Sequence, residues 1–593
     1  MENIMNGDLI LKWVEQHHAP PIVQQLRDEE KCAAWNFTRG CKKVLDIASE
    51  SKVTLGLESQ DISRIDFSKQ SYECAQKILK KKVNKFRTIH PKNPKIPYAD
   101  NSFDGIVCIG PYDWIFLNIN KLTKEIYRVL KEGGVFVFSV PTPQSPYYQK
   151  TKTKFRYYTK KNAFNLVNLC PWFLEDCKFI YQYPHPLHYS LVRAPNSIQN
   201  YAVKRAFRKS VQYTKDRSWE KSSYFVMCVR KIDYSYYLNQ AIDCLFRPAK
   251  KNGFFDSKTK SIARGLEYSI DKKQIIWGKQ QTTDYRYSSF ALMGLLYWRA
   301  SKYATPKYDK KIKKSLEYFC DKIKNDMKKD IPSYSSGPLI ITFSLAYQTL
   351  NEKKYKETAY TLYHSLKQNC SFNHSEDGLV LFGLCFFYEV FKEKTVLKEI
   401  DRALNKIMPK QDREGLFIFS NMTTKRHQNQ MYTLWGICMA SKILNKSDVL
   451  RHVERTIDHT INKRFLEDSA ILWEDIPFIK KTHLYLRRPF DKRQRYWKLL
   501  FECHQTFFFN AASYYILAGG RKNYQWPMLN SLGWIFGNNI LKENLVEKSR
   551  IGIPIRFMTI EGEITYPNEM FKGTYEIGSY LMALTNALSI FDV

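Results

Sequence analysis

The chain has 593 residues and thirteen cysteines, but no two cysteines have the spacing of a CxxC motif. This absence excludes the common structural zinc and dithiol redox motifs, so we expect no metal site. Scattered thiols in a large chain indicate a reducing, cytoplasmic location. The first residues, MENIMNGDLILKWVEQHH, lack the basic segment and apolar run of a signal peptide.

The chain also lacks hydrophobic runs long enough to cross a bilayer, which needs about 20 residues. The longest run, GLVLFGLCFFYEVF from Gly378, has 14 residues, which is typical of a buried core helix. We therefore expect no transmembrane segment.

Acidic residues are few relative to basic ones, and the formal net charge is +35. Such a charge favours an anionic ligand. The basic residues are dispersed along the chain, so nucleic-acid binding is not favoured. Aromatic residues make up 15% of the chain. They fit either a large helical core or a cleft for sugar rings.

Residues 1–38 are predicted to form N-terminal helices, broken at Pro20 and Pro21. From residue 39 the pattern alternates between short apolar strands and helices. Strands are expected at 44–47, 64–67, 103–109 and 135–140, and helices at 68–81 and 122–130. This alternation predicts an α/β domain over 39–232 with a parallel, doubly wound sheet.

Four segments of this domain, KVLDIASES, RIDFSKQ, IPYADNSFDGIVCIG and KEIYRVLKEGGVFVFSVPTP, resemble successive motifs of class I S-adenosylmethionine-dependent methyltransferases of the type 11-like group. Later elements also match: residues 156–159 start a helix, 179–183 form a strand and 222–231 form a closing strand. The resemblance spans residues 41–231. It implies a Rossmann-like sheet that ends in an antiparallel pair, and S-adenosylmethionine as the cofactor.

The resemblance also implies roles for individual residues. Asp66, at the end of the second strand, would bind the ribose hydroxyls of the cofactor. Asp46 would orient the following loop or meet the methionine ammonium. The expected cofactor site is completed by Ala48, Asn93, Cys108 and Gly110. Tyr112 and Asp113 are the candidate catalytic, substrate-contacting residues, although a plain turn is the alternative for them.

One turn departs from the family pattern. Family members carry a glycine-rich turn after the first strand, but here residues 48–52 read ASESK and contain no glycine. A non-glycine residue resists positive φ. A second hypothesis is therefore a degenerate methyltransferase fold that serves as a binding or scaffold module. His185 and His188 are either general bases or ordinary loop histidines.

From residue 233 to 593 we expect an all-α domain without strands. Six strongly apolar helices are predicted to start near residues 287, 337, 378, 428, 505 and 576. Amphipathic, lysine-rich helices such as 308–328 lie between them, as expected for repeated helical hairpins. The pattern resembles an α/α toroid of the (α/α)6 type, the architecture of six-hairpin glycosidases, sugar epimerases and terpenoid cyclases.

Polar residues flank the predicted inner helices and form a candidate cleft, made of Asp284, Arg286, Asp377, His427, Glu474, His504 and Glu576. One interpretation is a site for a sugar or acidic glycan, with carboxylates as acid and base. The alternative is that these residues cap helices and pack hairpins.

The leading hypothesis is S-adenosylmethionine-dependent methyl transfer to a small-molecule or glycan-type acceptor, with the helical domain recognising or modifying that substrate. Besides the scaffold module, a third hypothesis is a carbohydrate-active toroid enzyme with a passenger methyltransferase-like domain.

Overall fold

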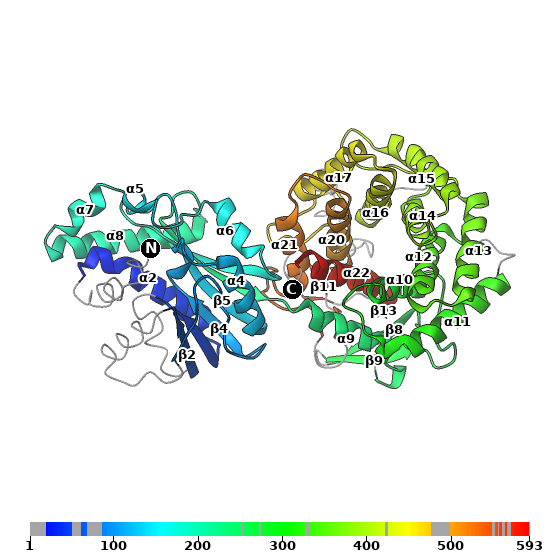
Figure 1. Ribbon diagram of the computed structural model, residues 1–593, viewed down its shortest axis with the longest axis horizontal. Helices are drawn as coiled ribbons and strands as arrows, with labels where there is room; N and C mark the ends of the chain where they lie inside the picture. Colours follow the sequence, from blue (N-terminus) through cyan, green and yellow to red (C-terminus); the bar gives the residue numbers. More distant parts are fainter. Residues whose placement is uncertain are drawn as a thin grey trace. The chain divides into compact units, whose positions relative to one another are not determined.

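The computed structural model of the protein (Figure 1) divides into two compact units, residues 1–233 and residues 234–592. The structure describes residues 19–49, 61–67, 86–216, 218–251, 253–271, 274–326, 331–420, 425–475, 499–547, 552–554, 557–559, 564–565 and 571–591. The helices expected within 1–18 and at 68–81 lie outside the described residues.

The N-terminal unit is built on a seven-stranded sheet with the order β3-β2-β1-β4-β5-β7-β6. Its strands are β1 (Lys43–Ile47), β2 (Asp61–Asp66), β3 (Phe86–Thr88), β4 (Phe103–Cys108), β5 (Leu130–Pro141), β6 (Trp172–Ile180) and β7 (Tyr224–Lys231). Strands β1 to β5 are parallel, whereas β7 runs antiparallel to both β5 and β6. The predicted Rossmann-like sheet and its antiparallel closing pair are confirmed.

Helices cover both faces of this sheet because side chains alternate between the faces along each strand. On one face, Val135 and Val137 belong to a core cluster with Leu26 of α2 (Pro21–Thr38). On the other face, Phe136 packs against Trp172, which contacts Tyr127 of α4 (Ile119–Val129). Helices α7 (Leu187–Val192) and α8 (Asn196–Asp216) pack on α2, and the short α5 (Tyr148–Thr151) and α6 (Lys160–Val167) connect β5 to β6.

Two strand boundaries differ from the prediction. The helix was expected to run to residue 130 and the strand to start at 135, but β5 already begins at Leu130, which pairs with Phe103 before a register shift leads to the pair of Val135 and Gly105. Strand β6 was expected at 179–183 but occupies Trp172–Ile180, where it follows the register of β7. Pairing with a neighbouring strand, which no local pattern records, sets both boundaries.

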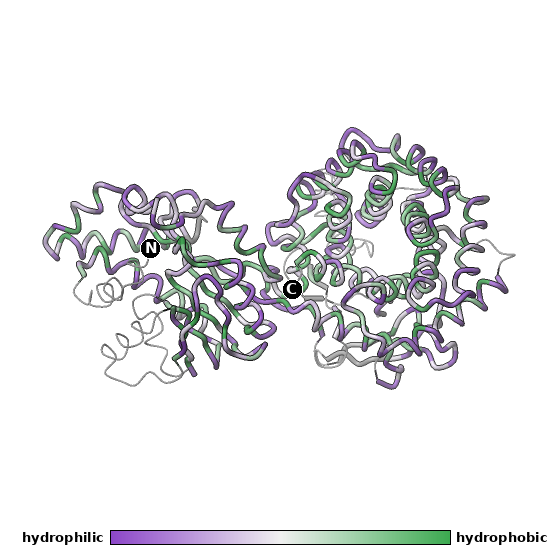
Figure 2. The backbone as a smooth tube through the Cα atoms, viewed as in Figure 1, coloured by the Kyte–Doolittle hydropathy of each residue, from purple (hydrophilic) through white to green (hydrophobic). Residues whose placement is uncertain are grey.

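The second unit is a ring of helical hairpins (Figure 1). The inner helices are α10 (Tyr287–Arg299), α12 (Ser333–Leu350), α14 (Asp377–Phe391), α16 (His427–Leu444), α20 (Glu502–Leu517) and α22 (Thr574–Phe591). Each packs against the next, and α22 packs against α10, which closes the ring. Outer helices alternate with them: α9 (Tyr234–Phe246), α11 (Asp309–Asp326), α13 (Lys353–Asn369), α15 (Lys394–Ile407), α17 (Leu450–Lys463) and α21 (Gln525–Ile535). The predicted α/α toroid is confirmed, and Figure 2 shows its inner helices as strongly hydrophobic.

The expectation that strands cease after residue 233 is wrong. Two small three-stranded sheets accompany the helices. One joins β13 (Phe571–Gly573) to β8 (Gly265–Asp271) and β9 (Gln274–Gln280), and the other joins β10 (Leu499–Leu500), β11 (Phe557–Thr559) and β12 (Ile564–Thr565). The β13 strand pairs across about three hundred residues of sequence with β8, so local patterning gave no signal for it.

Glycines let the inner helices approach one another closely. A Cβ on Gly578 of α22 would lie 2.2 Å from the carbonyl oxygen of Phe290 in α10, and one on Gly294 would lie 2.3 Å from the carbonyl oxygen of Gly578. A similar contact joins α14 and α16, where a Cβ on Gly378 would lie 2.6 Å from the Cα of Thr433. These neighbouring atoms belong to the backbone, which cannot move aside as a flexible side chain can. The helices can therefore pack this closely only with glycine at these positions.

We therefore expect Gly578→Ala to lower the free energy of unfolding of the helical unit by about 2 kcal/mol or more, through overpacking. Chemical denaturation followed by circular dichroism measures the change. Gly278→Ala is the control, because the nearest atom to its Cβ would lie 3.6 Å away. Equal stability of the two variants would contradict this account of ring closure.

Candidate functional site

The strand order of the N-terminal sheet reverses at β1, which is where this fold class forms its ligand-binding crevice. Strand β1 pairs in parallel with β2 on one side and with β4 on the other. In open α/β sheets, ligands bind outside the carboxyl ends of the strands at this switch point. Here Ala48 and Ser49 follow β1, and Gly110 follows β4 soon after its end.

Ala48 makes the turn for which the family uses glycine. Its φ is +48°, in the left-handed region, and its amide donates to the carbonyl oxygen of Ile65 in β2 at 2.8 Å. A left-handed residue with a Cβ costs about 1–2 kcal/mol. The loss of the first glycine therefore did not abolish the turn, because the smallest chiral residue adopts its conformation.

Ser49 ties the end of β1 to the end of β4. Its hydroxyl donates to the carbonyl oxygen of Val107 at 3.4 Å and accepts from the amide of Ile109 at 3.2 Å. The Ser49 amide in turn donates to Asp46 Oδ1 at 3.1 Å, and Arg64 Nε lies 3.7 Å from Asp46 Oδ2. Of the two roles expected for Asp46, these contacts match the orientation of the loop.

Asp66 ends β2 beside this turn. Its Oδ1 accepts from the amide of Phe67 at 2.6 Å, which fixes the carboxylate at the edge of the sheet. The Phe67 ring meets the Trp114 ring edge-on, with centroids 5.8 Å apart. Since Phe67 follows β2 and Trp114 follows β4, this pair reaches across the end of β1. Sequence reasoning gave neither aromatic a role in the site, although Phe67 ends the predicted strand 64–67 and Trp114 follows the predicted strand 103–109.

Tyr112 lies in the core, where its side chain offers little surface to a substrate, and its catalytic role stays a prediction. Its side chain is 1% exposed, its hydroxyl lies 2.7 Å from Thr123 Oγ1, and its ring packs against Phe138 at 4.9 Å. Burial holds the pKa of this phenol well above its usual value. The cause is the short 3-10 helix Pro111–Asp113, which turns the ring toward α4.

The other predicted residues of this crevice take varied positions. Cys108 is fully buried, and burial raises the pKa of its thiol, so only its backbone remains for a ligand. Gly110 has a φ of +107° and donates its amide to Ser139 Oγ at 3.2 Å. Asn93 is exposed and accepts from Lys121 Nζ at 3.4 Å. Asp113 is half-buried, and its carbonyl accepts from the amide of Arg156 at 2.7 Å.

A buried polar group, which we call the Gln182 cluster, lies near the ends of β5 and β6 and consists of Tyr147, Gln182 and His188. The Tyr147 hydroxyl lies 3.0 Å from His188 Nε2. Among the described residues, neither amide atom of Gln182 nor Nδ1 of His188 makes a well-aligned hydrogen bond, although the Gln182 amide interacts with the Tyr147 hydroxyl and lowers its pKa. Burial lowers the pKa of His188 to about 4, so the ring is neutral near pH 7. Buried polar groups without well-aligned partners are few in native structures.

In the helical unit, two of the predicted cleft carboxylates accept hydrogen bonds from backbone amides at the starts of helices. Asp284 Oδ1 accepts from the amide of Tyr287 at 2.7 Å, at the start of α10. Asp377 Oδ2 accepts from the amide of His374 at 2.9 Å, at the start of α14. Arg286 is exposed and stacks over Tyr334, 5.0 Å from the ring centre. Asp284 and Asp377 thus match the alternative capping role.

His427 and His504 begin adjacent inner helices and lie together, with ring centroids 6.0 Å apart. His427 Nε2 lies 3.0 Å from the carbonyl oxygen of His504, and His504 Nδ1 lies 2.8 Å from that of Ile471. Burial lowers the pKa of both rings, that of His504 to about 4. Trp473, which precedes the half-exposed Glu474, stacks on His504 at 4.8 Å.

Glu576 takes part in a buried charge triad with Glu502 and Lys572. Lys572 Nζ donates to both carboxylates, and Glu502 and Lys572 are only 1% and 2% exposed. Burial, opposed by Lys572 and reinforced by the charge of Glu576, raises the pKa of Glu502 to about 7. Sequence reasoning could not find Lys572, because it lies in a strand that the helical pattern did not predict.

Gln505 stands one helical turn beyond Glu502 and is fully buried. Within the described part of the chain, neither of its amide atoms has a hydrogen-bond partner, and Oε2 of Glu502 has none either. The two residues thus present unsatisfied donor and acceptor groups near the start of α20. A ligand hydroxyl group can pair with both kinds of group, because it both donates and accepts hydrogen bonds.

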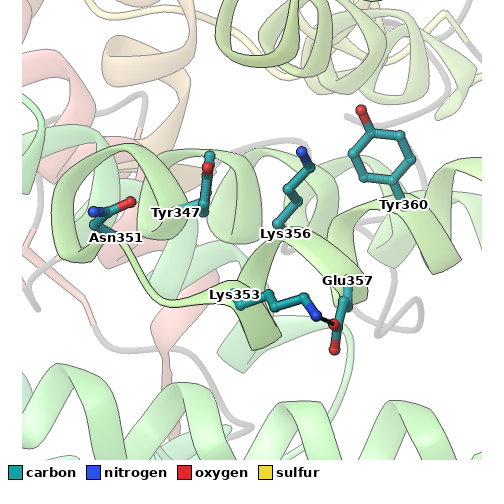
Figure 3. Close-up of a pocket in the computed structure, with 6 residues that line it drawn as sticks. All are labelled: Tyr347, Asn351, Lys353, Lys356, Glu357 and Tyr360. Carbon is teal, nitrogen blue, oxygen red and sulfur yellow. Dashed lines mark ion pairs between the residues drawn. The ribbon is translucent and has the colours of Figure 1, made fainter.

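A surface hollow of about 630 Å³ lies elsewhere on the ring, between α12 and α13 (Figure 3). Lys353 pairs with Glu357 at 3.5 Å, and Lys356 lies near the rings of Tyr347 and Tyr360. None of the predicted site residues lines it.

In the described ranges, no helix is long and apolar enough to span a membrane. No group of three or more His, Cys, Asp or Glu side chains in these ranges is arranged to hold a metal ion.

Comparison with known proteins gives a family match within the N-terminal unit. Residues 45–138 match a family described as a methyltransferase domain. No curated protein matches the chain.

Similar solved structures exist for both units. The helical part resembles the α-1,6-mannanase of Salegentibacter sp. HEL1_6, with 10% identity over 60% of this chain and 100% of that chain and a TM-score of 0.43. It also resembles the unsaturated glucuronyl hydrolase of Bacillus sp. GL1, with 12% identity over 59% and 96% of the chains and a TM-score of 0.41.

A Haloferax volcanii methyltransferase solved with the Trm112 activator is a third neighbour, with 12% identity over 38% of this chain and 98% of that chain and a TM-score of 0.27. Similarities this distant assign neither an activity nor a ligand to this chain. The family match and the sheet order together show that the chain contains a class I methyltransferase domain, followed by an α/α-toroid domain.

Proposed function

We propose that the protein is an S-adenosylmethionine-dependent methyltransferase that binds its cofactor at the switch point between β1 and β4. The left-handed turn at Ala48 carries this proposal. It keeps the backbone conformation of the glycine turn even though the glycines are gone. A scaffold module would have no reason to retain a strained turn that costs about 1–2 kcal/mol. The scattered cysteines favour a cytoplasmic reaction.

The residues present fit this cofactor. Asp66 supplies a carboxylate for the ribose hydroxyls, and the Phe67–Trp114 pair supplies apolar rings at the same edge of the sheet. Ser49 holds the turn open at a fixed distance from β4. When bound, the sulfonium would supply the activated methyl group. The protein would then contribute alignment and exclusion of water.

The Gln182 cluster is our candidate for the acceptor site. It lies at the carboxyl end of the sheet, and its incompletely satisfied amide and imidazole nitrogen suit a polar, hydroxyl-bearing acceptor. A neutral His188 can accept a proton without first losing one. The acceptor would thus be a small molecule or a glycan-type compound.

For the helical domain we propose recognition of a hydroxyl-rich ligand at the starts of α16, α20 and α22. Gln505 and Glu502 support this role, since burial without partners costs about 1–3 kcal/mol per group. Partly exposed aromatic side chains lie close by and suit sugar rings: Phe501 and Tyr575 stand at the starts of α20 and α22, and Trp473 stacks on His504. The two carboxylates that share Lys572 could also serve acid–base chemistry on a glycan.

The cofactor proposal is tested by titration calorimetry of the full chain with S-adenosylmethionine. We expect binding to weaken about 10- to 100-fold in Asp66→Asn, because charge-assisted hydrogen bonds to the ribose would be lost. Asp61→Asn, an exposed carboxylate at the other end of the same strand, is the matched control and should bind normally. An absence of binding by the unaltered chain would refute the proposal.

The proposed ligand site of the helical unit is tested by measuring the free energy of unfolding of variants at Gln505 and at a control position. We expect Gln505→Leu to raise the free energy of unfolding by about 1–2 kcal/mol, because an unsatisfied buried amide is removed. Gln430→Leu on α16 is the matched control. That glutamine is equally buried but both donates to and accepts from the backbone of Phe417, at 2.8 and 2.7 Å, so its loss should destabilise. A destabilised Gln505→Leu would show that Gln505 is structural.

A further inference from the structure

One segment of the N-terminal unit combines strong positive charge with exposed apolar side chains. Residues 177–215 contain seven Lys or Arg residues and no Asp or Glu. This segment includes α7 and all of α8 except its last residue, Asp216, and both helices pack on α2. In a chain that is one-tenth acidic overall, so long a stretch without a carboxylate marks a surface selected for anions.

The outward face of α8 is formed by a regular stripe. Gln199, Ala202, Ala206 and Ser210 are buried against the unit. On the opposite side, Tyr201, Lys204, Arg208 and Val211 are exposed and follow one another at helical spacings of three and four residues. The stripe thus places two cationic groups between two apolar ones, and Figure 2 shows hydrophilic and hydrophobic residues along this helix.

Apolar side chains gather around this stripe. Eleven large hydrophobic side chains are exposed among the described residues, and five of them lie on α7 and α8. They are Tyr201, 64% exposed, Ile198, 50% exposed, Phe207, 48% exposed, Leu187, 47% exposed, and Val211, 39% exposed. Such a concentration on one surface marks an interaction site.

The cations of α8 have no acidic partners within the described ranges. Lys204, Arg205, Arg208 and Lys209 form no ion pair there. Two of them instead lie over aromatic rings, Lys209 4.4 Å from the centre of Tyr181 and Arg205 6.0 Å from that of Tyr201. Their charges are therefore available to an external anion.

We propose that the α7–α8 surface docks on an anionic lipid bilayer. Helices that lie in the membrane interface present this combination, with cations for the headgroups and Leu, Ile, Phe and Tyr for the acyl boundary. A nucleic acid would leave the aliphatic side chains Leu187, Ile198 and Val211 without a matching surface.

The docking surface is continuous with the proposed acceptor site. Leu187 is exposed on α7, whereas the next residue, His188, is buried in the Gln182 cluster. If the acceptor binds there, as we proposed above, the membrane would deliver it, so a hydroxyl-bearing amphiphile is the acceptor class that the surface favours. This last step rests on the proposed function, whereas membrane docking does not.

Co-sedimentation of the full chain with lipid vesicles tests the docking. We expect binding to vesicles of equal parts phosphatidylcholine and phosphatidylglycerol, little binding to pure phosphatidylcholine, and weakening by salt. The double variant Lys204→Glu/Arg208→Glu should bind about 100-fold more weakly, since each cation near the surface contributes about 1 kcal/mol. Ile198→Ser/Tyr201→Ser should also weaken binding, without any change of charge.

Lys310→Glu/Lys314→Glu, on the exposed face of α11, changes the net charge equally and should bind like the unaltered chain. Equal losses in the two charge-reversal variants would overturn the proposal, because net charge alone would then explain binding. Failure to bind anionic vesicles, or binding to RNA that depends on Lys204 and Arg208 while vesicles do not bind, would also overturn it. Calorimetry with S-adenosylmethionine on the same variants, whose altered side chains lie on the outer face of α8, separates this outcome from failure of the cofactor site.

Discussion

The parallel pairing of β1 with both β2 and β4 is the constraint on which the proposed chemistry depends. It brings the residues that follow three strands to one edge of the sheet. It also forces the chain to turn sharply after β1, where Ala48 takes a left-handed conformation and Ser49 bridges to β4. The proposed cofactor site depends on this edge of the sheet, because Ser49, Asp66 and the Phe67–Trp114 pair all lie there.

Much of this arrangement could be predicted from local sequence. Apolar runs located β1, β2, β4 and β5, and the IPYADNSFD and KEGG segments indicated the fold. The direction of individual side chains could not be predicted. Tyr112 is an example, because the short 3-10 helix Pro111–Asp113 directs its ring into the core. The missing glycines suggested a lost turn, but Ala48 adopts the left-handed conformation at a small cost in free energy, because the neighbouring strands fix its backbone.

In the helical unit, the inner helices were predictable because they are apolar on every side. The site was less so. His427 and His504 were recognised by their position, whereas the Glu502–Lys572–Glu576 triad joins residues of α20, β13 and α22. Only ring closure, which requires the close glycine contacts of α10 with α22, brings these elements together. The described parts of both units thus hold buried polar groups without well-aligned partners, Gln182 in one and Gln505 in the other. Such groups reduce stability as long as they lack a partner.

Hydrogen–deuterium exchange of the full chain with saturating S-adenosylmethionine tests the central claim most directly. The account predicts slower exchange in peptides from residues 43–49, 61–67 and 103–114, with no change in α16, α20 or α22. Unchanged exchange at the ends of β1, β2 and β4, or protection confined to the helical unit, would contradict it.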